Sequence, residues 1–383
     1  MVKKSHWPAH KASTRRMASS SSRIVWVDYA KALAILGVFF LHGAVAGDRF
    51  AVIVAAFDMM VFFFLSGFVF SIQKHPTFLP FLWKKIRTLV VPGVFFVTVT
   101  FIVERVIDAL QGRFLSVSAY AKWLLGCLLN MRGHAGFGNI PWFLTCLFLI
   151  EIGGYVLLHL IRIVVCRWNT NRDALLVAIT AVALTAGWAY SVVVGRVLPW
   201  SGDIALSMFG FFVLGLIARE HRLTLERFLS VWAIIPALLI LVIAVIINRN
   251  LFGYEVNVYL NRYGNPICYM LGAIAGIWAV LSICRAMERI VPVNTLLGRG
   301  LSYFGRNTLT FYCVNDGIYP QFIPALLGLI GLQASTIAAG TPGQAVYAWC
   351  AILINIVFCI PCAAFMNRFL PEVLGKKRFK TSS

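Results

Sequence analysis

The sequence predicts an all-α polytopic integral membrane protein with about ten transmembrane helices and both termini in the cytoplasm. Three observations support this. Of the 383 residues, 60% are hydrophobic and 13% are charged, whereas an ordinary soluble domain carries about 25% charged residues. Apolar runs of about 20 residues, enough to cross a bilayer, recur from end to end. Lys and Arg concentrate in alternate loops, as the positive-inside rule requires.

The chain divides into one membrane domain, residues 25–366, between two basic cytoplasmic tails. Residues 1–24 are rich in Ser, Lys and Arg and are predicted to be disordered, and residues 367–383 form the second tail. The predicted spans cover residues 25–46, 51–72, 89–107, 141–161, 174–195, 203–218, 229–248, 265–284, 303–332 and 345–366. The ninth contains Pro320 and Pro324, where we expect a tilt, kink or break.

The distribution of positive charge fixes the predicted orientation. With the N-terminus inside, the cytoplasmic segments hold 24 Lys and Arg residues and the outer loops hold 7. The formal charge of +20 therefore belongs to loops and argues against nucleic-acid binding. The first apolar run is interpreted as an uncleaved span rather than a signal peptide, because Asp28 and Lys31 lie within it. The long outer loop 108–140 is expected to begin with a short interfacial helix and to end in a mobile Gly-rich stretch.

The first span carries polar side chains that a helix in hydrocarbon should avoid. At 100° per residue, Asp28, Lys31 and His42 share one helical face. Asp28 and Lys31 mark the cytoplasmic end, either as an ion pair or as part of a ligand site. His42 lies about 21 Å from Asp28 along the axis. A neutral imidazole there suits a general base, although a structural hydrogen bond to another helix is the alternative.

Other polar groups within the spans extend this pattern. Asp58 lies near the outer end of the second span and either orients His42 or faces water. Ser66 precedes Gly67 in a small pair that allows close packing. Lys84, Lys85 and Arg87 obey the positive-inside rule and also suit an anionic ligand such as a nucleotide phosphate.

The fourth and ninth spans add further candidates. Trp142 is either an interfacial anchor or a sugar-stacking platform. Glu151 lies mid-span and needs a partner, while Arg306 either reaches lipid phosphate or holds a ligand phosphate. The nine cysteines are interpreted as buried apolar groups. No His, Cys or carboxylate spacing suggests a metal, so none is predicted.

Five segments, in order, resemble the integral-membrane acyltransferase-3 family, especially its fucose-4-O-acetylase-like branch. They are "VDYAKALAILGVFFLHG" (27–43), "FFFLSGF" (62–68), "KKIRTLVVP" (84–92), "PWFLTCLF" (141–148) and "GRNTLTFY" (305–312). The resemblance covers residues 25–366. Related members often carry His-Met-Pro where this chain has Asp58-Met59-Met60, and a histidine in place of Asn315. Roles tied to those histidines are therefore absent or rerouted here.

The resemblance implies an O-acetyltransferase of the bacterial inner membrane that takes acetyl from cytoplasmic acetyl-CoA. The acceptor would be a sugar hydroxyl of an exported polysaccharide, lipid-linked oligosaccharide or glycoconjugate. By this resemblance, the residues expected in catalysis are His42, Asp58, Ser66 and Asn315, with Ser66 or Asn315 stabilising the oxyanion. Those expected to bind acetyl-CoA are Asp28, Lys31, Lys84, Lys85, Arg87 and Arg306. Those expected to contact the acceptor are Trp142, Glu151 and Tyr312.

Two other functions remain open from the sequence. A glycolipid transporter or flippase would use the polar face of the first span, formed by Asp28, Lys31 and His42, as a substrate or proton path. A sugar N-acetyltransferase would leave an alkali-stable amide rather than an ester.

Overall fold

The computed structural model describes residues 23–43, 49–73, 76–329, 331 and 342–376. Within these ranges every regular element is a helix, apart from one isolated β-bridge between Asn257 and Arg262. The predicted all-α membrane class is confirmed. Residues 1–22 and 377–383 of the predicted tails, and residues 330 and 332 of the span predicted at 303–332, lie outside the described residues.

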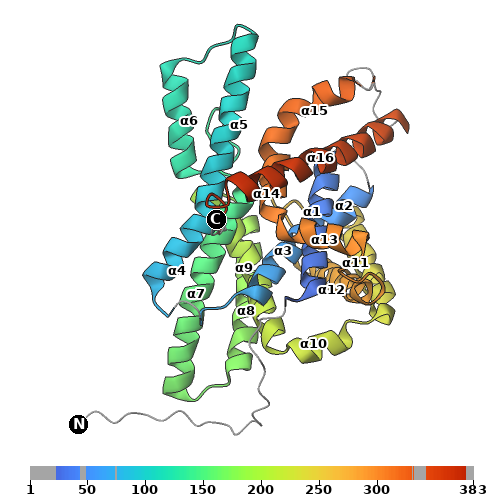
Figure 1. The fold of residues 1–383 in the computed structure, drawn as a ribbon. Coiled ribbons are helices and arrows are strands. Elements are labelled where there is room, and N and C mark those ends of the chain that lie inside the picture. The colour runs from blue at the N-terminus through green and yellow to red at the C-terminus, as the bar shows by residue number, and fades with distance from the viewer. Residues whose placement is uncertain (1–22, 44–48, 74–75, 330, 332–341, 377–383) are drawn as a thin grey trace, which may run out of the picture.

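Nine helices of the described chain are long and apolar enough to cross a membrane (Figure 1). Several are compound, since short breaks or π-turns interrupt them. In chain order they are α1 (Val25–Gly43), α2 with α3 (Arg49–Ala55, Asp58–Val69), α4 with η1 and α5 (Phe78–Lys85, Ile86–Val90, Val91–Leu110), α7 (Trp142–Trp168), α8 (Arg172–Val193), η2 with α9 (Pro199–Ser201, Gly202–Glu220), α11 (Val231–Asn250), α12 (Pro266–Ile290) and α16 (Pro342–Phe369).

The segment predicted as the ninth span consists of shorter helices in the described residues. These are α13 (Leu296–Arg306), α14 (Thr308–Cys313), the π-helix η3 (Val314–Ile318) and α15 (Tyr319–Gly328). The first break falls at Asn307, before Pro320 and Pro324, and a second change of helix type, from η3 to α15, falls beside Pro320. The Asn307 side chain donates to the Tyr303 carbonyl and accepts from Asn367. Such local bonds compete with the helical ladder.

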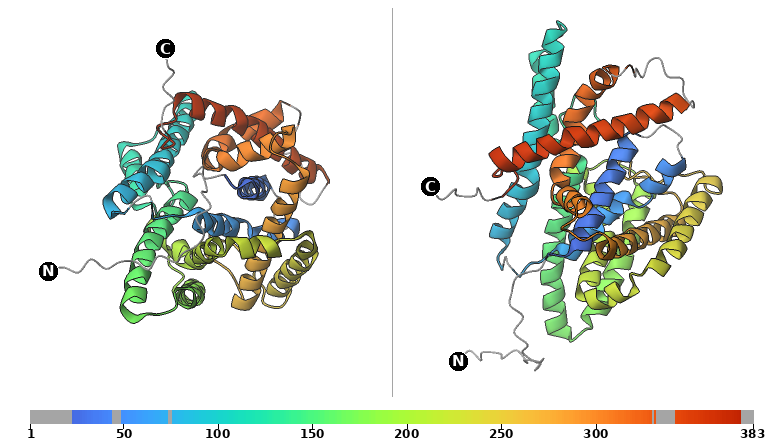
Figure 2. Two further views of the ribbon diagram at one scale, coloured as in Figure 1. Left: turned by 60° about the horizontal axis from the view of Figure 1, so that its bottom comes forward. Right: turned by 45° about the vertical axis from the view of Figure 1, so that its right-hand side comes forward.

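Helix α1 lies at the centre of the molecule, with other helices around it (Figure 2). It contacts α3, α12, α13, α14 and α16. Trp26, Tyr29, Ile35 and Phe39 on α1 are fully buried. Because neighbouring helices surround α1, its polar side chains face protein rather than lipid.

Helices α3 and α9 cross closely at two glycines. A Cβ added at Gly67 would lie 1.9 Å from the Phe212 carbonyl oxygen, and one at Gly215 would lie 2.0 Å from that of Phe64. Only glycine permits this approach. The small pair Ser66–Gly67 therefore packs a helix.

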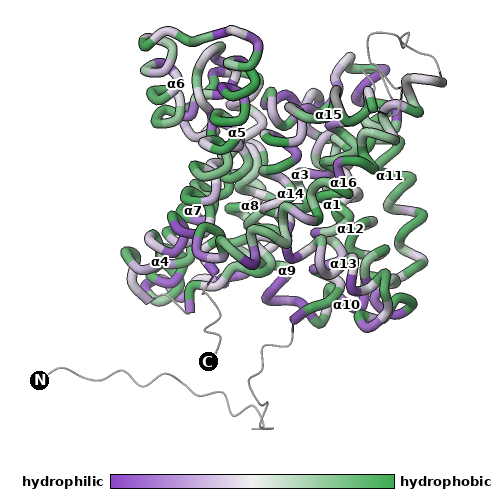
Figure 3. The backbone as a smooth tube through the Cα atoms, turned by 45° about the horizontal axis from the view of Figure 1, so that its top comes forward, coloured by the Kyte–Doolittle hydropathy of each residue, from purple (hydrophilic) through white to green (hydrophobic). Residues whose placement is uncertain are grey.

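A helical hairpin of α5 and α6 (Val117–Leu129) extends from one end of the bundle (Figure 1). Ser116 caps α6 by accepting from the Ala119 amide, and the Trp123 ring stacks on Phe101 of α5 at a centroid distance of 4.0 Å. A short helix was predicted in this loop and is present. Hydrophilic residues gather at the other end of the bundle, around α4, α10 (Arg222–Phe228) and α13 (Figure 3).

Candidate active site

Two polar regions lie at the two ends of α1. At one end His42 faces a cavity, which we call the His42 cavity. At the other end positive side chains from several elements gather near Lys31, and we call this the basic end, defined by Arg23, Lys31, Arg306 and Lys376.

The hydrogen bonds of His42 fix its chemistry. Its Nδ1 lies 3.0 Å from the Val38 carbonyl oxygen, which can only accept, so Nδ1 carries the proton. Nε2 is therefore a free base in the neutral ring. It lies 3.7 Å from Oδ1 of Asp316, and the His42 side chain, which lines the cavity, is 45% exposed. An imidazole that accepts a proton at Nε2 would gain a facing carboxylate.

The π-helix η3 brings Asp316 to this position. Within η3, Asn315 contacts α16 and Asp316 lines the cavity, and π-turns are frequent at functional sites. The Oδ1 of Asn315 accepts a hydrogen bond from the Asn355 amide of α16. Asn315 is buried and does not line the cavity. Of these two neighbours, Asp316 and not Asn315 lines the cavity beside His42.

The His42 cavity has a volume of about 490 Å³ and an aromatic and amide lining. The rings of Trp142 and Tyr259 meet at 6.3 Å and 66°. Tyr312 also lines it, so two of the three residues predicted to contact the acceptor lie beside His42. The remaining polar residues of the lining are Asn130, Arg132, Asn139, Asn257 and Asp316.

A buried ion pair supports one wall of this cavity, and sequence reasoning missed it. Arg132 is bidentate on Asp203, with one N–O distance of 2.7 Å, and its Nε donates to the Tyr259 carbonyl at 2.7 Å. Arg132 and Asp203 are 6% and 1% exposed. A buried pair with satisfied hydrogen bonds fixes its neighbours. Arg132 therefore holds the loop that carries Tyr259.

Asp58 and Ser66 lie away from the cavity. Asp58 is 1% exposed and packs against Gly37 of α1, and no described hydrogen bond or ion pair joins it to His42. The carboxylate that faces His42 is that of Asp316 and not that of Asp58. Ser66 is eight residues further along the same segment, about 12 Å by helical rise, and does not line the His42 cavity.

At the basic end the ion pairs differ from those the sequence suggested. Asp28 accepts from Arg23 at 2.5 and 2.9 Å, rather than pairing with Lys31. Glu151 pairs with Lys85 at 2.8 Å. Glu151 does not line the His42 cavity, and Lys85 engages its carboxylate instead. Lys31 lies within electrostatic reach of Asp28, Arg23 and Glu151.

Positive charges converge on the C-terminal segment of the described chain. Burial and the nearby charges of Arg23 and Arg306 lower the pKa of Lys376. The side chains of Lys84, Arg87 and Arg306 are exposed in the same end region of α4, η1 and α13. Mutual repulsion of this kind favours binding of an anion.

No three His, Cys, Asp or Glu side chains come together as metal ligands in the described ranges. A family model described as an acyltransferase domain matches residues 24–364. No curated protein and no solved structure matches this chain significantly. The matched range contains α1, the residues that line the His42 cavity, and Lys31 and Arg306 of the basic end. The chain therefore belongs to acyltransferase family 3 and is a multi-pass membrane acyltransferase.

Proposed function

We propose that this protein is an O-acetyltransferase of a bacterial inner membrane, and that it moves acetyl from cytoplasmic acetyl-CoA to a sugar hydroxyl on the outer side. The observation that carries the proposal is the free Nε2 of His42, set beside Asp316 in a cavity lined by aromatic rings and amides. The family supplies acyl transfer, and the cavity supports the acceptor class.

The lining of the His42 cavity suits a sugar. Flat aromatic faces such as Trp142 and Tyr259 match the apolar C–H face of a pyranose, while amides and hydroxyls hydrogen-bond to its hydroxyl groups. The carboxylate of Asp203 compensates the charge of Arg132, and the Tyr259 carbonyl engages its Nε, so Arg132 offers no uncompensated charge to an anionic acceptor. A neutral sugar is the ligand that these groups fit best.

The proposed reaction is direct transfer. The acceptor hydroxyl oxygen attacks the thioester carbonyl carbon while Nε2 of His42 removes the hydroxyl proton. A new C–O bond forms, the C–S bond breaks, and the thiolate leaves and takes the proton to give free CoA. Asp316 stabilises the imidazolium meanwhile. The Tyr312 hydroxyl is the proposed oxyanion donor, because Ser66 and Asn315 lie outside the cavity.

The basic end is the proposed site of the CoA phosphates. Arg23, Arg306 and Lys376 crowd together there, and Arg87 is exposed close by. Lys85 is engaged by Glu151, with side chains only 17% and 10% exposed. We therefore assign the CoA phosphates to the basic end and Arg87. We assign Lys85 to a structural ion pair with Glu151.

The test is deletion of the gene in its host, followed by measurement of base-labile acetyl esters on surface polysaccharide and glycolipid. Wild type, His42→Ala and His159→Ala are restored at matched membrane levels. His159 is a matched control, because its Nδ1 also bonds a carbonyl four residues earlier but it lines neither cavity. Esters should return with wild type and His159→Ala and stay absent with His42→Ala.

Other outcomes would contradict the proposal. Esters that persist after deletion, together with an unmodified glycolipid held inside the cell, would indicate a transporter. A lost alkali-stable acetamide would indicate N-acetyl transfer. Full restoration by His42→Ala would keep the reaction class and remove His42 from the mechanism.

A further inference from the structure

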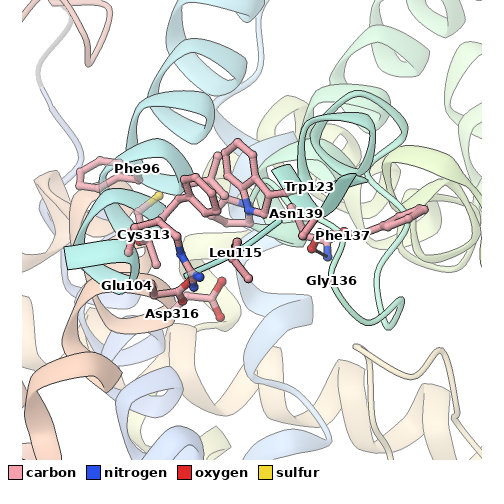
Figure 4. A pocket seen from close by; sticks show the side chains of 17 residues that line it. Phe96, Glu104, Leu115, Trp123, Gly136, Phe137, Asn139, Cys313 and Asp316 are labelled. Carbon is pink, nitrogen blue, oxygen red and sulfur yellow. Dashed lines mark hydrogen bonds and ion pairs between the residues drawn. The ribbon is translucent and has the colours of Figure 1, made fainter. Parts of the chain in front are cut away.

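A second cavity, which we call the Trp123 cavity, opens on the other side of Asp316. It has a volume of about 420 Å³ and lies between α5, α6, the loop before α7 and the π-helix η3 (Figure 4). Asn139, Pro141 and Asp316 line both cavities. The two cavities are therefore neighbours across the carboxylate that faces His42, and a ligand longer than one sugar could occupy both.

The walls of the Trp123 cavity are built from aromatic rings. Trp123 and Phe101 stack at 4.0 Å and 25°, and Phe137 lies on the adjoining loop. The Trp123 carbonyl accepts from the Gly138 amide at 3.1 Å, which ties α6 to that loop. In Figure 4 the Trp123 ring and the carboxylates of Glu104 and Asp316 face the same space. Flat rings beside acceptor oxygens suit a sugar ring.

The charges of the lining select against an anion. Its ionisable side chains other than Cys313 are Glu104, Arg105 and Asp316, a formal excess of one negative charge. Arg105 is held by Asp108 at 2.7 Å and by Glu104 at 3.6 Å. A phosphate or an acidic sugar would meet two carboxylates and an occupied guanidinium. A neutral sugar meets no such repulsion.

We propose that the Trp123 cavity binds a neutral sugar residue next to the one that is acetylated, so that the acceptor is an oligosaccharide or polysaccharide chain. This rests on the proposed O-acetyltransferase function and extends it. The acetylated sugar lies in the His42 cavity, and its neighbour in the chain passes Asn139 and Asp316 to stack on Trp123. The enzyme thereby recognises at least two consecutive sugar residues of the acceptor chain.

The experiment uses purified full-length protein, acetyl-CoA and fragments of the host's deacetylated surface polysaccharide, separated by size from one to four sugars. We expect kcat/KM to rise roughly tenfold or more between one sugar and two or three, as for one well-stacked aromatic contact. Trp123→Ala should abolish that rise while the KM for acetyl-CoA stays unchanged. Leu128→Ala changes a 66% exposed residue of the same helix and should keep the rise in kcat/KM.

A second variant separates loss of the site from loss of folding. Glu104→Gln keeps the shape of the side chain and removes one negative charge, so it should improve binding of fragments that carry an acidic neighbouring sugar. Fragment binding is measured directly as well as through activity, and unfolding temperatures are compared.

The remaining outcomes are decisive. If wild type acetylates one sugar and three equally well, the second sugar site is wrong, although the proposed function stands. If no fragment is acetylated by wild type, the proposed function fails and this inference fails with it. A single sugar linked to a lipid pyrophosphate anchor serves as a further acceptor. If Trp123→Ala abolishes only the gain in kcat/KM that this anchor gives, the cavity binds the anchor. If it raises only the KM for acetyl-CoA, the cavity belongs to the donor. Either result overturns the proposal.

Discussion

Nε2 of His42 on α1 lies 3.7 Å from Oδ1 of Asp316 on the π-helix η3, although 274 residues separate them in the chain. The two groups share the His42 cavity. In the proposed mechanism, a carboxylate in this position would stabilise the imidazolium formed when His42 takes a proton.

Asp316→Asn should reduce kcat by about 100-fold, because the imidazolium loses its counter-charge while the cavity keeps its shape. Initial rates of acetyl transfer from labelled acetyl-CoA measure this. Asp173→Asn, which removes a 51% exposed carboxylate on α8, should leave the rate at the wild-type level. Equal rates in both variants would show that Asp316 does not assist His42.

Arg132→Gln should lower stability by about 3–5 kcal/mol, because it leaves Asp203 buried without its partner. Arg132→Gln with Asp203→Asn should recover much of that loss, since no uncompensated charge remains. Denaturant unfolding in detergent measures both. In the double variant the KM for the acceptor should still be raised, because the bond from Arg132 to the Tyr259 carbonyl is missing. An unchanged KM would show that the cavity wall held by Arg132 does not contribute to acceptor binding.

Arg306→Gln should raise the KM for acetyl-CoA about tenfold with little change in kcat, because one charge-assisted contact to phosphate is lost. The increase should shrink at high salt, which screens the wild-type contact. Arg289→Gln, an exposed arginine at the end of α12, is the matched control. A fall in kcat at constant KM would place Arg306 outside the donor site.

Glu226 on α10 gives a prediction for pH dependence. Burial alone would raise the pKa of Glu226, but hydrogen bonds from Arg222 and Trp26 lower it overall. Its pKa in the folded protein thus lies below the unfolded value of about 4.3. The ionised group therefore stabilises the fold above that value, and the contribution is lost as pH falls through the folded-state pKa.

Glu226→Gln should accordingly lower the unfolding temperature at neutral pH by a few degrees. The gap between variant and wild type should narrow below about pH 4. Thermal unfolding across a pH series measures both. Glu255→Gln, at a 48% exposed side chain, should show neither effect. A gap that stays constant with pH would mean that packing, and not charge, accounts for Glu226.

Gly67→Ala should lower the unfolding temperature strongly, because its Cβ would lie 1.9 Å from the Phe212 carbonyl oxygen. Gly300→Ala has no atom within 4 Å of the added Cβ, so it should be neutral or stabilise α13 by up to about 1 kcal/mol. The two variants are compared by thermal unfolding. Similar unfolding temperatures for the two variants would mean that α3 and α9 can move apart without loss of stability.

Much of the fold could be predicted, because membrane helices are specified by local hydropathy. The polar face of α1 also singled out His42, which lines the His42 cavity, and its role as a base stays a prediction. The break at Asn307 and the π-turn at Val314–Ile318 could not be predicted from hydropathy. They depend on side-chain bonds to α16, such as those of Asn307 and Asn315 with Asn367 and Asn355.

The partners of the charged groups were the weakest part of the prediction. Sequence spacing suggested Lys31 for Asp28 and Asp58 for His42, since these are close along the chain or at the same depth. The structure pairs Asp28 with Arg23, and His42 with Asp316. Asp316 still gave a signal, because a carboxylate within a predicted span is itself a functional hypothesis. Arg132 and Asp203 lie in separate segments, and only tertiary packing reveals their pairing.

The central position of α1 has a consequence for donor selection. Eleven helical steps separate Lys31 from His42, which sets a length of about 17 Å between the basic end and the imidazole. A donor with its phosphates at the basic end must carry its acyl group on a narrow arm of comparable length. A small phosphorylated acyl donor is too short to bridge that span. If the proposed donor site is right, the rigid length of one helix would discriminate between donors by the length of the arm that carries the acyl group.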